Sequence, residues 1–500
     1  MLDSSVTASE VTVVLPRPFP ARMPAPCAAV PGPAAAALVA SVVSRPDTAV
    51  CDVPVPVQSE GGRVRGYLTS SRLASLLSTA GQESTTTVLP AFVTGLAGGV
   101  PLAIAGMEAV GHAGGMAARF GGAEIALRRP RWRGLVSLVG HAGMGLASAL
   151  LALSGVAWQA ATVRVGSWAA RGLRTPLRPA QASEVTTVDR MGRRLGVERS
   201  IDAVGAALGP VLALLFLTFL EVRTVILLAV LPAVAAVAVS ARANRRRAAQ
   251  PGGNPTRPDL DVLQPDAVWQ LPSLRSRIDQ LRRGRLGRFL LGVAIYETAN
   301  IAAVLLLLRA TKLLPAGTGP FSQLQLVALL YIGYQLSAAV CASWAGALAD
   351  RIGTGPIIAG GATCLLTAYV GFALAGTNEL LLLAVCFVLA GAAAGAVDAA
   401  EYTGVGRLAS PEIRWTAFGT LAALQSDGRA IATLTAGALW TFVAPEAGLL
   451  FCAPLLVVVT ILFTVRADRP ARAGHRMTGT PARSKVPSRR VGLPKPDFGL

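Results

Sequence analysis

Apolar runs of roughly 20 residues, the length of helix that crosses a bilayer, recur along this chain from about residue 71 onward. Of the 500 residues, 53% are hydrophobic and 15% are charged. A soluble domain carries about 25% charged residues. This balance excludes a disordered, collagen-like or coiled-coil chain, and it predicts an all-α integral membrane protein.

The apolar segments form two groups of six, separated by a longer polar interval. They are residues 71–93, 96–118, 134–154, 156–170, 200–220 and 222–240, followed by 287–308, 322–345, 356–376, 379–399, 415–440 and 446–465. We therefore expect twelve transmembrane helices, as a six-helix bundle over residues 67–240 and a second over 287–466. The cytoplasmic central loop, residues 241–286, ends in a basic and partly amphipathic stretch. We interpret it as a linker, with a surface helix on anionic lipid as the alternative.

The charge of the chain is strongly positive, at +19 from 46 Lys and Arg against 27 Asp and Glu. A soluble protein with this charge would suggest nucleic-acid binding. Here the arginines gather in alternate loops, as the excess of Lys and Arg in cytoplasmic loops requires. We therefore expect a multi-pass protein of the cell (plasma) membrane with both termini cytoplasmic, in contact with lipid and with no nucleic acid.

The two ends of the chain have different compositions. Residues 1–66 are rich in Pro, Ala and Val, and we expect a disordered cytoplasmic tail there. A weak likeness to a signal peptide leaves open whether these residues belong to the mature protein. Residues 467–500 form a basic tail that we expect to be cytoplasmic.

Cysteine and histidine usage predicts neither a disulfide framework nor a metal site. The six cysteines show no paired spacing, and the chain has three histidines. The sequence also has no G-x-S-x-G, H-E-x-x-H or Walker motif. We expect a protein that is not an enzyme, binds no metal or cofactor and does not hydrolyse ATP.

The two groups of segments share short sequence features. The first helix of each group has a Glu near its middle, Glu83 in Q-E-S-T-T and Glu297 in Y-E-T-A-N. Each group also has an Arg-rich loop before its fifth helix, followed by a small-residue segment, R-R-L-G (193–196) and W-T-A-F-G (415–419). These matches indicate tandem six-helix repeats.

The loop after the eighth segment reads G-A-L-A-D-R-I-G, from Gly346 to Gly353. It resembles the signature loop of the major facilitator superfamily, at the position of the family's second copy. Gly346 would allow close helix packing, Asp350 would accept from backbone N–H groups at a helix N-terminus, and Arg351 would add a cytoplasmic ion pair. We expect this loop to gate the cytoplasmic side. The first-half copy, within residues 115–133, is degraded, with Glu124 as the nearest acid.

Two further segments resemble a bacterial drug-efflux-like branch of that superfamily. V-R-V-G-S-W-A-A-R-G-L-R-T-P-L-R (163–178) resembles its Arg-bearing fourth helix, and R-S-I-D-A-V-G-A-A-L-G-P (199–210) its fifth. The second segment contains part of the antiporter signature, at Gly205, Gly209 and Pro210. Asp202 opens this helix, either as a functional acid or as an N-terminal cap. The branch commonly has an Asp four residues before the first-helix Glu, where this chain has Thr79.

Ionisable groups in the apolar segments are the candidate site residues, because burying them in a bilayer costs about 2.5 kcal/mol or more each. We expect proton coupling or substrate binding at Glu83, Glu108, Arg164, Glu297 and Asn300. Glu108 and His112 share a helix face. Arg164 would pair with Glu83 or Glu108, and the sequence does not choose between them. Structural ion pairs are the alternative interpretation.

The resemblance implies a secondary active transporter that works by alternating access and couples a proton gradient to export of a small organic molecule or drug. We expect it to act as a monomer. An importer of a nutrient or metabolite is one alternative, and a non-transporting sensor or scaffold with the same fold is another.

Overall fold

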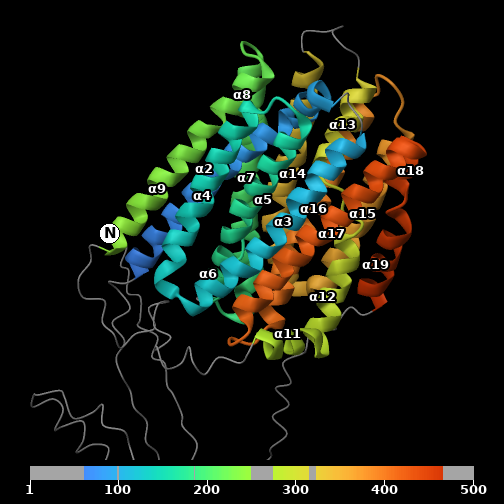
Figure 1. Cartoon of the computed structure of the whole chain (residues 1–500). Coiled ribbons are helices and arrows are strands. Elements are labelled where there is room, and N and C mark those ends of the chain that lie inside the picture. The colour runs from blue at the N-terminus through green and yellow to red at the C-terminus, as the bar shows by residue number, and fades with distance from the viewer. Residues whose placement is uncertain (1–60, 98–100, 185, 249–273, 315–321, 466–500) are drawn as a thin grey trace, which may run out of the picture. The chain divides into compact units, whose positions relative to one another are not determined.

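The computed structural model describes residues 61–97, 101–184, 186–248, 274–314 and 322–465 (Figure 1). Most of the predicted N-terminal tail, much of the central loop and the basic C-terminal tail lie outside these ranges. The described residues from Ser70 onward belong to one compact unit. Helix α2 begins at Gly61, earlier than the predicted boundary at residue 67.

Every regular element in the described ranges is helical. The first half comprises α2 (Gly61–Ala97), α3 (Pro101–Arg128), α4 (Arg133–Leu153), α5 (Ala157–Arg174), α6 (Leu177–Glu184), α7 (Met191–Leu217), α8 (Val222–Leu228) and α9 (Val230–Ala248). After α11 (Leu274–Arg282), the second half comprises α12 (Gly284–Glu297), α13 (Ala303–Leu313), α14 (Gln323–Ile352), α15 (Thr354–Leu374), α16 (Leu380–Leu408), α17 (Arg414–Phe442), α18 (Pro445–Leu450) and α19 (Ala453–Val465).

Each of the twelve predicted segments coincides with one helix or with two consecutive helices. Within the described residues, seven helical stretches are long and apolar enough to cross a membrane. Helices α2, α3, α5 and α17 and the broken pair α12–α13 are outside that set. Helices α12 and α13 are each shorter than 18 residues, and polar or charged residues interrupt the other four. The all-helical membrane fold is supported, while the count of twelve spans stays a prediction.

The two halves contact each other along two helix pairs, α3 with α17 and α7 with α14 (Figure 1). Along α3 and α17, the backbone N–H of Leu102 donates to Thr441 Oγ1 at 3.1 Å, and Ser426 Oγ donates to the carbonyl of His112 at 2.9 Å. A Cβ at Gly419 would lie 2.8 Å from that of Ala123. The halves therefore contact each other from one end of this pair to the other.

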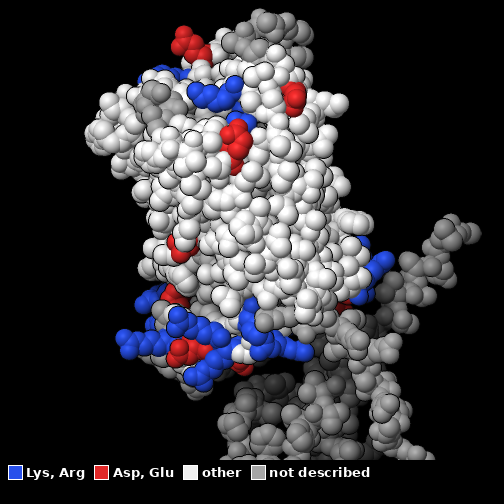
Figure 2. Space-filling view, turned by 90° about the vertical axis from the view of Figure 1, so that its right-hand side faces the viewer, with Lys and Arg blue, Asp and Glu red and all other residues white. Residues whose placement is uncertain are grey.

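Positive side chains gather at one end of the unit. Helices α6 and α11 lie at the lower end in Figure 1, and Lys and Arg cluster at that end in Figure 2, below a broad band with few charges. We call this the basic end. An uncharged band bounded by basic loops is the pattern expected of a protein inserted in a bilayer.

The first and fifth helices of each half approach each other in the same way. A Cβ at Gly209 of α7 would lie 2.6 Å from the Cβ of Glu83 on α2. In the second half, a Cβ at Gly428 of α17 would lie 2.5 Å from the Cβ of Glu297 on α12. Each glycine lets a helix backbone pack directly behind a buried Glu, as tandem repeats would predict.

Replacing Gly209 with Val is expected to destabilise the protein by about 1–3 kcal/mol, because overpacking forces neighbouring backbones apart. The new Cβ would lie 2.5 Å from the Ser84 nitrogen and 2.7 Å from the Ala80 carbonyl oxygen. Gly166→Ala on α5 is the matched control, since a Cβ added there would have nothing within 4 Å. Thermal unfolding in detergent should show a lower midpoint for Gly209→Val alone. Equal midpoints would contradict the close approach.

Candidate functional site

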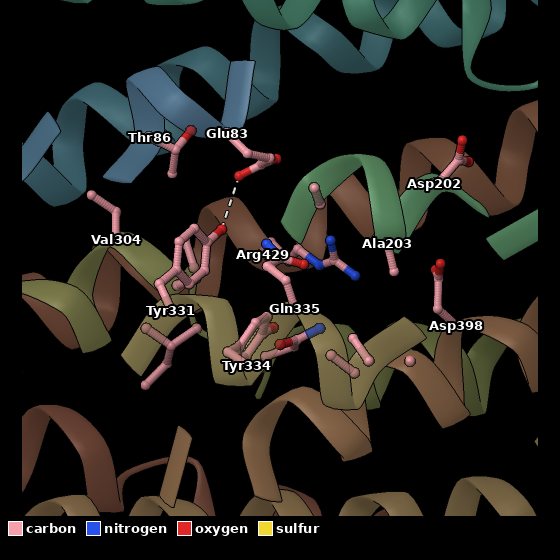
Figure 3. Close-up of a pocket in the computed structure, with 18 of the residues that line it drawn as sticks. Glu83, Thr86, Asp202, Ala203, Val304, Tyr331, Tyr334, Gln335, Asp398 and Arg429 are labelled. Atoms are coloured by element: carbon pink, nitrogen blue, oxygen red, sulfur yellow. Dashed lines mark hydrogen bonds between the residues drawn. The ribbon is translucent and has the colours of Figure 1, made fainter. Parts of the chain in front are cut away.

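A polar cavity of about 210 Å³ lies between the two halves (Figure 3). Helices α2, α3, α5 and α7 line it from the first half, and α13, α14, α16 and α17 line it from the second. Its charged lining residues are Glu83, Glu108, Asp202, Asp398, Arg164, Arg171, Arg199 and Arg429. A cavity with four acids and four cations favours polar or charged contents over a purely apolar ligand.

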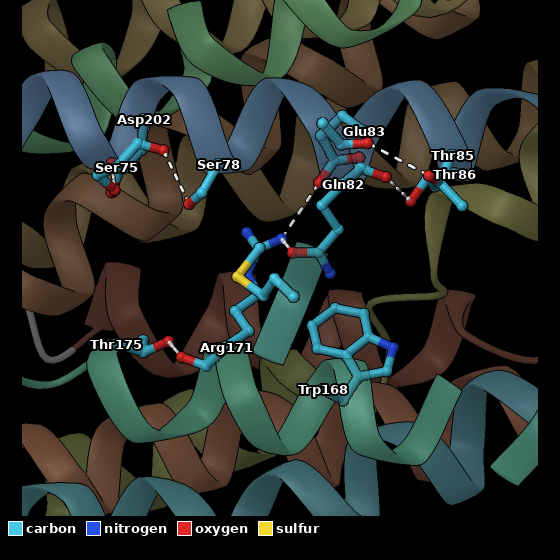
Figure 4. A network of polar contacts seen from close by, with 12 residues as sticks. Ser75, Ser78, Gln82, Glu83, Thr85, Thr86, Trp168, Arg171, Thr175 and Asp202 are labelled. Carbon is cyan, nitrogen blue, oxygen red and sulfur yellow. Dashed lines mark hydrogen bonds and ion pairs between the residues drawn. The ribbon is translucent and has the colours of Figure 1, made fainter. Parts of the chain in front are cut away.

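Glu83 connects three helices across this cavity. Tyr331 Oη on α14 donates to Glu83 Oε2 at 2.8 Å, so this bond joins the second half to the first (Figure 3). Arg171 Nη1 on α5 donates to Glu83 Oε1 at 3.2 Å and to Gln82 Oε1 at 2.9 Å (Figure 4). The carboxylate of Glu83 thus links an ion pair within the first half to a contact between the halves.

Arg164 pairs with Glu108, so the structure chooses between the two partners that the sequence leaves open. Arg164 Nε donates to Glu108 Oε1 at 2.6 Å, and the two side chains are 3% and 2% exposed. Trp168 Nε1 donates to Glu108 Oε2 at 3.2 Å. His112 Nε2 lies 3.9 Å from Glu108 Oε2, which places both residues on one face of α3.

Glu297 forms the corresponding buried ion pair in the second half. Arg429 Nε on α17 donates to Glu297 Oε2 at 2.9 Å, and the Glu297 side chain is 1% exposed. Asn300 Nδ2 donates to the same oxygen at 2.9 Å. Asn300 also lines the cavity, but its amide donor is engaged by Glu297 in this conformation.

Asp202 lies inside α7, which begins at Met191, so the interpretation as an N-terminal cap is wrong. Its carboxylate accepts from Arg199 Nη2 at 2.5 Å, from Ser75 Oγ at 3.0 Å and from Arg178. Near Asp202, a Cβ at Gly205 would lie 2.8 Å from the Cα of Leu76, and Pro210 is buried in the same helix. This part of α7 therefore packs closely on α2.

The gating loop, Gly346 to Gly353, forms the last turns of α14 at the basic end and contacts the N-terminus of α7. Asp350 accepts from the backbone N–H groups of Gly192 and Arg193 at 2.7 Å each, at the N-terminus of α7. A Cβ at Gly346 would lie 2.4 Å from the Gly192 carbonyl oxygen, so glycine permits this approach. Gly353, with φ of +90°, ends α14 in a conformation that favours glycine.

Asp350 forms an ion pair with an arginine that the sequence does not indicate. Arg407 Nη2 on α16 donates to Asp350 Oδ1 at 2.7 Å. Arg351 is exposed, and within the described residues it forms no ion pair. The ion pair expected of Arg351 is therefore not formed with any described residue, because the Arg351 side chain points toward solvent.

Sequence reasoning missed several cavity residues. Arg171 falls just after the predicted end of its segment at residue 170, yet α5 continues to Arg174. Asp398 and Glu401 lie near the predicted end of theirs, yet α16 continues to Leu408. Gln425 Nε2 on α17 donates to Asp398 Oδ1 at 2.9 Å and to Glu401 Oε2 at 2.8 Å. The prolines at 176 and 411 are the helix-stop signals that could have found these residues.

Within the described ranges, no group of three or more His, Cys, Asp and Glu side chains is arranged to hold a metal ion. The thiols of Cys341, Cys364, Cys386 and Cys452 are unpaired, the last two of them buried.

Comparisons with known proteins show similarity to transporters of one superfamily. The family model of the Major Facilitator Superfamily matches residues 289–496. An uncharacterized MFS-type transporter of Methanocaldococcus jannaschii is 25% identical over 398 residues, which cover 78% of this chain and 92% of that protein.

Two solved structures share the fold. The human organic anion transporter MFSD10 has a TM-score of 0.59 at 19% identity, covering 80% of this chain and 99% of its own. The nucleoside transporter NupG has a TM-score of 0.58 at 14% identity, covering 80% and 98%.

The family model and the relative show that this chain is similar to major facilitator superfamily transporters, and the solved structures show that it shares their fold. The family model and the relative support transmembrane transport, and they point to transporters, which are not enzymes.

Proposed function

We propose that this chain is a secondary active transporter that exports a small organic molecule by alternating access, driven by a proton gradient. The observation that carries the proposal is the polar cavity lined by both halves, with contacts between the halves at each end. A cavity in this position can open to one side of the membrane when the contacts on that side separate.

Glu83 supports the coupling to protons. Its carboxylate accepts from Arg171 in its own half and from Tyr331 in the other half. Protonation would remove the charge that holds Arg171 and would weaken the bond from Tyr331. A proton at Glu83 would therefore change a contact between the halves, which is what coupling requires.

Glu297 supports the same role in the second half. Protonation would release Arg429, a cavity-lining cation, from the ion pair that now occupies it. The released guanidinium could then receive an anionic or hydrogen-bonding group of the substrate. Proton binding and substrate binding would in this way compete for one arginine.

The direction and orientation belong to the proposal as well. The basic end would face the cytoplasm, with both termini cytoplasmic in the plasma membrane. Export, in the manner of the drug-efflux branch, is favoured by the partial antiporter signature at Gly205, Gly209 and Pro210. We propose that the monomer contains the complete pathway, because one chain lines the whole cavity.

The test is an uptake screen with the purified full-length protein in proteoliposomes under an imposed pH gradient. The panel contains drugs, sugars and metabolites, and protein-free liposomes are the control. We expect at least one compound to accumulate against its gradient while protons move the other way, and a protonophore to abolish this accumulation. Movement of compound and protons in the same direction would favour import. Binding without flux would contradict transport and favour a sensor or scaffold.

A further inference from the structure

Arg277 of helix α11, in the segment between the halves, is fully buried, with a side chain 0% exposed. Its Nη2 donates to both carboxylate oxygens of Glu124, at 2.8 and 3.0 Å. Its Nη1 donates to Thr416 Oγ1 at 2.7 Å. Glu124 lies near the end of α3 in the first half, and Thr416 lies in the first turn of α17 in the second. One guanidinium therefore joins the central segment to both halves.

This contact corresponds in position to the gating contact made by Asp350. There, an acid at the end of α14 reaches the N-terminus of α7, the fifth helix of the other half. In the first half, the acid near the end of α3 is Glu124, and the fifth helix of the other half is α17. Within the described residues, Glu124 accepts hydrogen bonds from Arg128 and Arg277, and Arg277 spans the distance to α17.

The charges around Glu124 keep it ionised. Glu124 lies beyond the predicted span of residues 96–118. Burial raises the pKa of its carboxyl, but hydrogen bonds from Arg277 and Arg128 outweigh this effect and hold the pKa below its usual range. A carboxylate with two guanidinium partners is a strong anchor, and removing one partner from a buried pair leaves an uncompensated charge.

We propose that Arg277 is a positioning residue that holds the basic end closed in the first half, replacing the degraded signature loop. This proposal rests on the proposed function, because it assumes that the basic end opens during alternating access. Helix α11 is then a working part of the gate. The halves separate at this end only when Arg277 leaves Glu124 or Thr416.

The test measures exposure of the α3–α17 contact in the purified full-length protein in detergent micelles. The native cysteines are replaced by Ser, and Ala123→Cys is the reporter, since Ala123 is 3% exposed and packs against Gly419. Ala105→Cys is a second reporter at the opposite end of the same helix pair, where Ala105 is 0% exposed and faces Gly437. Alkylation by a hydrophilic maleimide is followed for each reporter.

Arg277→Ala is expected to speed alkylation at the Ala123 reporter by about tenfold or more, because a buried anchor of this kind contributes more than that factor to the closed state. Alkylation at the Ala105 reporter should stay unchanged. Arg275→Ala is the matched control, because Arg275 is exposed on the same helix, and it should change neither rate. An Arg277→Ala rate at Ala123 within about twofold of the parent would overturn the proposal.

If Arg277→Ala exposes both reporters through unfolding, two milder variants test whether the Arg277 contact holds the basic end closed. Glu124→Gln removes the charge that Arg277 binds, and Arg277→Lys keeps a cation without the bidentate fork. Both should raise the Ala123 rate alone, with Arg277→Lys the smaller effect, and no rise in either would overturn the proposal. Because alkylation needs no substrate, a protein that opens in this way but moves nothing would contradict the proposed function and leave this proposal standing.

Discussion

Replacing Arg164 with Gln is expected to destabilise the protein by about 3 kcal/mol or more, because Glu108 would stay buried without its cation. Both side chains are nearly inaccessible, and their atoms lie 2.6 Å apart. The remaining neighbours of Glu108 are Trp168, which donates one hydrogen bond, and His112 at 3.9 Å. A single indole donor does not compensate a buried carboxylate.

A second substitution distinguishes the cost of an unpaired Glu108 carboxylate from a general loss of packing at Arg164. Glu108→Gln in the Arg164→Gln background removes the uncompensated charge, so the double variant should recover much of the lost stability. Arg245→Gln on α9 is the control, because Arg245 is exposed and its loss should cost no more than about 0.5 kcal/mol. Thermal unfolding in detergent measures all four proteins. A double variant less stable than Arg164→Gln alone would contradict this account of the pair.

Hydropathy predicts where the helices of this fold lie, but it identifies only seven helical stretches of the described residues as long and apolar enough to cross a membrane. The stretches 222–246 and 445–465 have mean hydropathies of 2.5 and 2.6 and are easily found. Helices α2, α3, α5 and α17 line the cavity, and their polar residues lower the hydropathy on which the prediction depends. Four of the helices that line the cavity are therefore identified poorly by hydropathy, whereas α7, α14 and α16 also line it and are identified well.

Candidate charges could be predicted from the sequence, whereas their partners could not. A charge within an apolar segment is conspicuous, and Glu83, Glu108, Arg164 and Glu297 all border or lie beside the cavity. The ion pairs join residues 56 positions apart for Arg164 and Glu108, and 132 apart for Arg429 and Glu297. Such pairing depends on how helices rotate and pack, which one sequence does not specify.

Gating residues can be predicted more completely where the motif is intact. The acid of the second-half loop, Asp350, reaches a helix N-terminus as its chemistry requires. The arginine that pairs with it, Arg407, comes from a helix end 57 residues away and could not be found by spacing. For the first-half contact, Arg277 lies in the segment that the sequence analysis interprets as a linker. Only the folded structure shows that it reaches Glu124.

The carboxylates of Glu83, which lines the cavity, and of Glu297, which pairs with the lining residue Arg429, are expected to be indispensable for coupled flux. Glu83→Gln and Glu297→Gln keep the shape of each side chain but remove the site where a proton binds, so gradient-driven accumulation should fall by roughly tenfold or more. Glu412→Gln is the control, because Glu412 is an exposed acid outside the cavity.

Proton and substrate flux through these variants, measured in proteoliposomes, decides whether the two carboxylates couple transport to protons. Insertion is first matched between the parent and the variants, and the compound is one identified by the uptake screen. The parent and Glu412→Gln should exchange protons for the compound, while Glu83→Gln and Glu297→Gln should lose gradient-driven accumulation. Correctly inserted Glu83→Gln and Glu297→Gln proteins that move compound and protons as the parent does would contradict proton coupling at these carboxylates.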